Sequence, residues 1–170
     1  MNDVSDNELI KVLGRCEVFM GLTDDDLRKV ALLPSTHFET YDVDTTVTKA
    51  TEAAENIYIL VDGQVDLWLT VENVLEKHTH WIKVDTVRKG SVFGWSALVQ
   101  PYAYSRTAIC SMKSYMLAIN GKELIGLMDR DEHIGYEVMR SIACVIASRL
   151  RTPNHFFWAE SIKTRNGVNS

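Results

Sequence analysis

Cysteine is scarce in this sequence, and no two cysteines stand close together. The three are Cys16, Cys110 and Cys144, an odd number without a Cys-x-x-Cys pair. A disulfide framework or a thiolate zinc site needs paired cysteines at short, regular spacings, so this pattern disfavours both. We therefore expect three buried free thiols.

Long apolar runs and an excess of positive charge are also lacking. No hydrophobic stretch approaches the ~20 residues that span a bilayer, and residues 1–8 lack the basic and apolar regions of a signal peptide. The net charge of −5 argues against a general nucleic-acid or anionic-membrane binder. We therefore expect a cytoplasmic protein with neither partner. A local basic pocket for a phosphorylated small ligand is compatible with this charge.

The sequence also lacks the common catalytic motifs. The sequence contains no HExxH, GxSxG or Walker loop. His78-Thr79-His80 has the spacing seen in small β-barrel metalloenzymes, but Val84 and Asp85 stand where a ligating glutamate should follow. We interpret these histidines as solvated loop residues, and we predict a protein that holds no metal and is not an enzyme.

The sequence does contain enough apolar material for one folded domain. Hydrophobic residues make up 46% of its 170 residues, which excludes a fully disordered chain. Helical signals come first, over residues 5–33. Thr23 and Asp26 have the spacing of a capping box, and Pro34 disfavours helical geometry at Leu33, so a helix should end about there.

From residue 36 to 119 the pattern changes to seven or eight short strands. Residues 57–61 and 64–71 are the clearest of them. The Asp62-Gly63 step between them is a strong type I′ turn signal and predicts a hairpin. Short strands with regular turns predict an antiparallel β-sandwich or jelly roll.

Helical periodicity returns over 123–151. Its apolar stripe, from 134 to 150, is broad enough to cover the sandwich and also to meet a partner helix; packing against its own domain alone is the alternative. The predicted fold is mainly β with flanking helices, in one domain over 1–151, and 152–170 form a C-terminal tail.

The most informative segment lies between the strands, at 91–108. Gly94 can adopt a positive φ, and Pro101 pushes Gln100 out of helical geometry, so the helix between them is limited to about one turn. Arg106 follows closely. Backbone N–H groups at a helix start attract an anion and a guanidinium grips two of its oxygens, so the combination suits a cyclic phosphate. An ordinary strand–turn–helix corner with a surface arginine is the plainer alternative.

Ser91-Val-Phe-Gly-Trp-Ser-Ala-Leu-Val-Gln-Pro101, with Ser105-Arg-Thr-Ala108, closely resembles the phosphate-binding cassette of the cyclic-nucleotide-binding domain family. That family includes catabolite-activator-type regulators, kinase regulatory subunits and cyclic-nucleotide-gated channels. The resemblance extends from about Leu13 to Arg151, and it implies the same fold and a regulatory module for cAMP or cGMP, without another cofactor. It assigns the cyclic phosphate to Gly94, Ala97, Leu98, Arg106 and Thr107.

Two further residues bear on ligand choice. The resemblance implies that Thr107 permits cGMP, because a hydroxyl here accompanies tolerance of guanine nucleotides in the family; a threonine kept for its β-propensity is the alternative. Trp95 departs from the family pattern, in which a glutamate accepts a hydrogen bond from the ribose 2′-hydroxyl, whereas an indole N–H only donates. Trp95 has three placements open to it: turned outward with weak binding retained, stacked on a differently placed ligand, or filling the pocket.

The resemblance also indicates how a signal leaves the site. In relatives of the activator type the C-terminal helix forms the dimer seam, so we expect a homodimer through residues 134–150. The residues after Arg151 are too few for two more helices of average length, ~11–12 residues each, so we expect output to a separate protein or through dimerisation. Phe156, Phe157 and Trp158 are candidates for capping a bound base, with dimer contact or core packing as alternatives. The sequence thus predicts a cyclic-nucleotide sensor; the rival is a scaffold or dimerisation module of the same fold whose pocket Trp95 fills.

Overall fold

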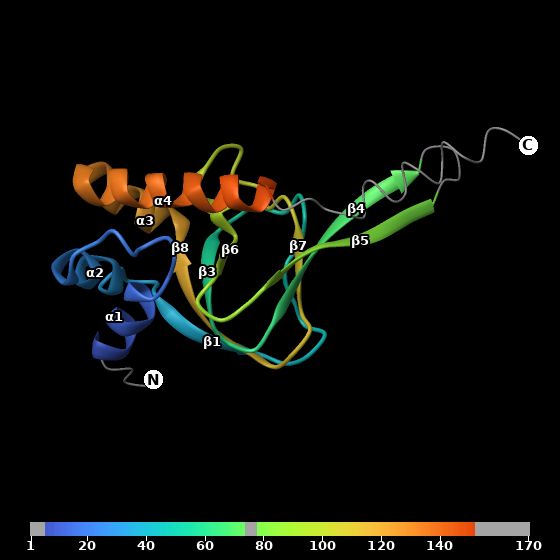
Figure 1. Cartoon of the computed structure of the whole chain (residues 1–170), viewed down its shortest axis with the longest axis horizontal. Coiled ribbons are helices and arrows are strands. Elements are labelled where there is room, and N and C mark those ends of the chain that lie inside the picture. The colour runs from blue at the N-terminus through green and yellow to red at the C-terminus, as the bar shows by residue number, and fades with distance from the viewer. Residues whose placement is uncertain (1–5, 74–77, 152–170) are drawn as a thin grey trace, which may run out of the picture.

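The computed structural model describes residues 6–73 and 78–151, in which two four-stranded antiparallel sheets lie beside four α-helices (Figure 1). The strands are β1 (His37–Tyr41), β2 (Thr46–Thr48), β3 (Asn56–Asp62), β4 (Val65–Asn73), β5 (His78–Val87), β6 (Val92–Phe93), β7 (Thr107–Cys110) and β8 (Ser114–Asn120). The helices are α1 (Asp6–Gly14), α2 (Asp24–Ala31), α3 (Gly121–Arg130) and α4 (Glu132–Arg151), with a 3₁₀ turn, η1 (Trp95–Leu98). One sheet has the order β1-β8-β3-β6 and the other β2-β7-β4-β5. The predicted fold class, a mainly β sandwich with flanking helices, is confirmed.

Strand β3 lies between two apolar layers, which explains why it is hydrophobic almost throughout. Ile57 and Ile59 pack with side chains of the helices, whereas Tyr58 and Leu60 pack in the cluster between the two sheets. Successive side chains of a strand point to opposite faces, so the run of apolar residues serves both layers at once. Figure 1 shows the helices gathered over this sheet, while β4 and β5 extend away from them.

The helices from the two ends of the chain meet beside that sheet. Thr23 and Asp26 form the predicted capping box at the start of α2, which ends slightly before the expected position. The Lys29 ammonium lies 2.7 Å from the carboxylate of Asp131, directly before α4, and the His133 imidazole lies 3.6 Å from the Asp26 carboxylate. The beginning of α4 is therefore tied to α2.

The hairpin predicted at Asp62-Gly63 is wrong. β3 pairs with β8 and β6, whereas β4 pairs with β7 and β5, so this turn carries the chain from one sheet to the other. A type I′ turn needs a positive φ at both central residues, but of these two only Gly63 has one, at 94°. A Cβ on Gly63 would lie 2.4 Å from the Lys113 carbonyl oxygen, so the glycine also permits close approach to the neighbouring turn.

The expectation of three buried thiols holds for two. Cys16 and Cys110 are buried, but Cys144 is exposed. The reason is helical spacing, because Ile142 and Val145 face the core and position 144 falls on the other side of α4.

We expect a single fast-reacting thiol when native protein is treated with an aromatic disulfide reagent. Burial raises the pKa of Cys16 to about 12 and also raises the pKa of Cys110, so neither presents a thiolate near neutral pH. Absorbance of the released thiolate measures the reaction. The variant Cys144→Ser should lose it, while denatured wild-type protein should show all three thiols; rapid labelling of native Cys144→Ser would contradict the burial of the other two.

The described residues bear on two further sequence predictions. Within 6–73 and 78–151, no group of three or more His, Cys, Asp or Glu side chains is placed to hold a metal ion. His80 is exposed on β5, a strand rather than the loop that was expected, and the side chain of His78 lies outside the description. No helix in the same ranges is both long and apolar enough to cross a membrane.

Candidate functional site

The segment after β6 has the local geometry that the sequence predicts. Gly94 has φ 77° and ψ 15°, in the left-handed region that favours glycine, and η1 occupies only four residues before Val99 becomes extended. A Cβ at position 94 would lie 2.8 Å from the Asn56 carbonyl oxygen, so β3 also requires a glycine here. The predicted positive φ and the single helical turn are confirmed.

Ala97 and Leu98 fix this short helix in place. Both side chains are buried, and the Ala97 amide donates to the Gly94 carbonyl at 3.0 Å. A Cβ on Gly121, at the start of α3, would lie 2.6 Å from the Ala97 carbonyl oxygen. The cassette helix is therefore clamped between the sheet and α3, with its backbone held in one orientation.

Arg106 lies in the loop before β7 and is half-buried. Its Nη1 donates to the carbonyl of the adjacent Ser105 at 2.7 Å. No carboxylate of the described residues comes within ion-pairing distance of its guanidinium, although several other basic side chains have such partners. The charge of Arg106 is therefore balanced by no acidic group in the described part of the chain.

Arg106 and the cassette line one cavity. Its volume is about 30 Å³, whereas pockets for small ligands are roughly 300–1,000 Å³. The lining residues are Thr48, Leu67, Phe93, Gly94, Trp95, Ser96, Tyr104, Ser105 and Arg106. The structure thus brings Gly94, Trp95 and Arg106 together, but a nucleotide fits there only after some of these side chains move.

A larger cavity, about 370 Å³, adjoins the first and shares Thr48 and Tyr104 with it. Its lining includes Glu52 and Glu55, whose carboxylates repel an anion. The electrostatics therefore favour the Arg106 cavity for a phosphate.

Thr107 is buried, with 4% of its surface exposed, and its hydroxyl accepts a hydrogen bond from the Ala50 amide at 3.1 Å. The hydroxyl that the resemblance connects with guanine nucleotides is therefore engaged within the protein. This contact favours the alternative in which Thr107 serves the fold rather than ligand choice.

Trp95 is half-buried between the cavity and α4. Its indole packs against the helical core, and the guanidinium carbon of Arg149 lies 4.4 Å from the ring centroid. Sequence reasoning missed Arg149, although a signal was present: spaced by helical turns from Ile142 and Val145, it falls on the apolar stripe of α4. Phe156, Phe157 and Trp158, the candidate base cap, lie outside the described residues.

A family model described as "Cyclic nucleotide-binding domain" matches residues 38–131, more than half of the chain. The chain belongs to this family. The matched range contains the cassette and Arg106. Of the predicted site residues, Gly94, Trp95 and Arg106 line the cavity, whereas Ala97, Leu98 and Thr107 do not.

Solved structures of the family share the fold. A candidate cyclic nucleotide-binding protein from Geobacter metallireducens GS-15 is 24% identical, with a TM-score of 0.69 over 87% of this chain and 99% of that one. The sensor domain of the transcriptional regulator DNR from Pseudomonas aeruginosa is 15% identical, with a TM-score of 0.66 over 88% and 95%. A mutant regulatory subunit of a cAMP-independent protein kinase A from Trypanosoma brucei, bound to cAMP, is 14% identical, with a TM-score of 0.64 over 92% and 51%. No curated protein is significantly similar in sequence.

Proposed function

We propose that this cyclic nucleotide-binding domain is a sensor for cAMP or cGMP. Arg106 pairs with the cyclic phosphate, and backbone amides of 94–98 complete its binding. The observation that carries the proposal is a guanidinium without a carboxylate partner among the described residues, on a cavity lined by the cassette. A cation in this setting is suited to a charge-assisted, two-pronged contact with phosphate oxygens.

Binding requires the cassette cavity to enlarge. At about 30 Å³ it holds roughly one water molecule. The ligand therefore binds an arrangement in which Trp95 and neighbouring side chains have moved, and it shifts the population toward that arrangement. The same small volume, with Trp95 in the lining, favours a second candidate function: a scaffold of the same fold that acts through protein contacts alone.

Calorimetric titration of the full chain with cAMP and cGMP tests the two functions. A sensor gives saturable heat with at least one nucleotide and none with 5′-AMP, which lacks the cyclic phosphate. We expect affinity weaker by roughly ten- to 150-fold than a site with the family glutamate provides, because Trp95 offers no acceptor to the ribose. No heat with either cyclic nucleotide up to millimolar concentration would contradict the sensor and favour the scaffold.

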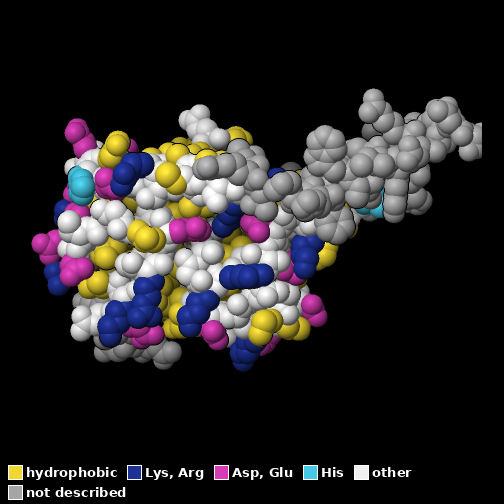
Figure 2. Space-filling view, in the orientation of Figure 1, with side chains coloured by type: hydrophobic (Ala, Val, Ile, Leu, Met, Phe, Trp, Pro, Cys, Tyr) yellow, Lys and Arg dark blue, Asp and Glu magenta, His cyan; other side chains and the backbone are white. Residues whose placement is uncertain are grey.

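We also propose that output is regulatory rather than catalytic and passes through α4 in a homodimer to a separate protein. On α4, Ile134 and Val138 face the core, while Tyr136 and Met139 are 65% and 39% exposed. Figure 2 shows hydrophobic side chains among polar ones along the upper edge of the molecule, where α4 lies. An outward apolar strip on a helix that already has a buried face is suited to a second helix.

Met139→Glu is expected to convert the dimer to a monomer, because a charge would be buried in the helix–helix seam. Light scattering coupled to gel filtration gives the mass of the wild type and the variant at equal concentration. Met112→Glu is the matched control, since Met112 is also an exposed methionine but lies between β7 and β8. A wild-type monomer, or equal loss of dimer in both variants, would contradict a seam along α4.

A further inference from the structure

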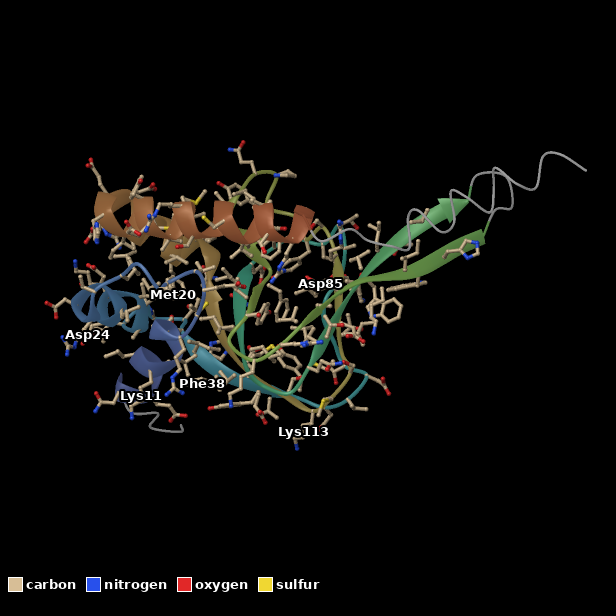
Figure 3. The ribbon with its side chains drawn as sticks, in the orientation of Figure 1. Lys11, Met20, Asp24, Phe38, Asp85 and Lys113 are labelled. Atoms are coloured by element: carbon tan, nitrogen blue, oxygen red, sulfur yellow. The ribbon has the colours of Figure 1, made fainter. Side chains whose placement is uncertain are left out.

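Arg149, near the end of α4, contacts three segments that are distant in sequence. Its guanidinium carbon lies 4.4 Å from the Trp95 ring centroid, its Nη2 lies 3.6 Å from the Glu17 carboxylate and its Nε lies 3.6 Å from that of Asp85. Figure 3 shows Asp85 on β5 beneath the last turns of α4. One side chain thus joins the C-terminal helix to the cassette helix, the N-terminal region and the second sheet.

The same group of residues holds Val92, two positions before the cassette glycine. Arg149 Nη2 donates to the Val92 carbonyl at 2.7 Å, and the Val92 amide donates to Glu17 at 3.3 Å. Both backbone polar groups of Val92 are therefore occupied, one by Arg149 and the other by the carboxylate that Arg149 faces. The strand that leads into the cassette cannot shift without disturbing these contacts.

Arg149 depends on this arrangement because its charge is largely removed from water. Its side chain is only 24% exposed, its Nη1 is buried without a hydrogen-bond partner among the described residues, and desolvation lowers its pKa despite the nearby carboxylates. A desolvated guanidinium gains more from an aromatic face than an exposed one does. A shift of the α4 end relative to Trp95 would leave the charge of Arg149 poorly compensated. We therefore expect the end of α4 and the cassette to move together.

We propose that Arg149 and Trp95 form a latch that ties the end of α4 to the cassette and opposes enlargement of the cassette cavity. Trp95 is part of the lining of the 30 Å³ cavity and is also the surface on which Arg149 stacks. Moving the indole to admit a ligand separates it from Arg149, and releasing α4 frees the indole to move. Because such coupling is reciprocal, loosening the latch strengthens ligand binding. For the nucleotide this inference rests on the proposed function, whereas the mechanical coupling does not.

Hydrogen exchange of the full chain without nucleotide tests the mechanical coupling. Arg149→Met keeps an unbranched apolar side chain and removes the guanidinium with its charge. We expect exchange to accelerate about tenfold both in the cassette, 94–98, and in the end of α4, 145–150, while the central strand β8 is unchanged and reports global stability. Arg149→Lys, which keeps the charge but loses the planar stack, should give an intermediate acceleration in both segments.

Arg140→Met is the matched control. Arg140 is also on α4 and also near an aromatic ring, 5.9 Å from the centroid of Tyr136, but its ion pair is with Glu137 of the same helix. It should leave exchange in the cassette unchanged. Unchanged cassette exchange in Arg149→Met, or equal acceleration in Arg140→Met, would overturn the latch.

Nucleotide titration provides the second measurement. Arg149→Met is expected to bind the cyclic nucleotide about fivefold more tightly than wild type, at the lower end of typical coupling between sites. Weaker binding by this variant would show that Arg149 supports the bound arrangement and would overturn the proposal. If neither protein binds a nucleotide, the sensor function fails, and the exchange experiment still decides whether the latch exists.

Discussion

Replacing Arg106 with methionine is expected to weaken cAMP binding by about 2–5 kcal/mol, roughly 30- to 5,000-fold. The bound phosphate would lose its charged partner, and among the described residues no other basic side chain lines the cavity to replace it. Thermal stability should hardly change, because within 6–73 and 78–151 the guanidinium bonds only to the carbonyl of its own neighbour, Ser105. Calorimetric titration and the unfolding midpoint, measured on the same preparation, give both quantities.

Two further variants make this result specific. Arg106→Lys keeps the charge without the planar fork, so its affinity should fall between those of the wild type and Arg106→Met. Arg88→Met removes an exposed arginine from the turn after β5 and should not alter binding. Unchanged affinity in Arg106→Met, with saturable binding in the wild type, would show that the anion binds elsewhere.

Replacing Trp95 with glutamate is expected to strengthen binding of cAMP roughly ten- to 150-fold. A carboxylate after Gly94 would accept a hydrogen bond from the ribose 2′-hydroxyl. A hydrogen bond to a charged group is worth about 1.5–3 kcal/mol. Removal of the indole also enlarges the cavity that it lines. The dissociation constants for cAMP, measured by the same titration, check this expectation.

Trp95→Leu separates the two contributions, because it removes the ring without adding an acceptor. If the family's ribose contact can be restored here, the glutamate variant binds more tightly than the leucine variant. Equal affinities would show that the ribose lies away from position 95. A wild type that gives no heat beside two variants that bind would identify Trp95 as the residue that fills the pocket.

Local patterns were sufficient for much of the fold. The capping box at Thr23 depends on residues three apart, and the positive φ of Gly94 is a conformation that glycine itself permits, so both were predictable. The turn at Gly63 shows the limit of such reasoning. Its Asp-Gly pair indicates a tight turn but does not specify which strands pair. β3 is buried on both faces and belongs to one sheet, whereas β4 belongs to the other.

The site divides in the same way. Gly94 and Arg106 belong to one short motif, so the sequence predicted that they would lie together. The surroundings of Trp95 depend on Arg149, which is distant in sequence and reaches the indole only because α4 packs across the sheet. For Cys144 the information was present in the sequence but was not used. The period of α4 already indicates that its side chain faces away from the core, although burial was expected.

The ties at the two ends of α4 give the helix the geometry of a lever. Near its start, Asp131 and His133 join it to α2, and near its end Arg149 joins it to Trp95. The 20 residues of α4 span about 30 Å, so a swing of about 10° around the first tie displaces the far end by roughly 5 Å. Release of Arg149 from Trp95 would thus allow the end of α4 to move by a distance large enough for another protein to detect.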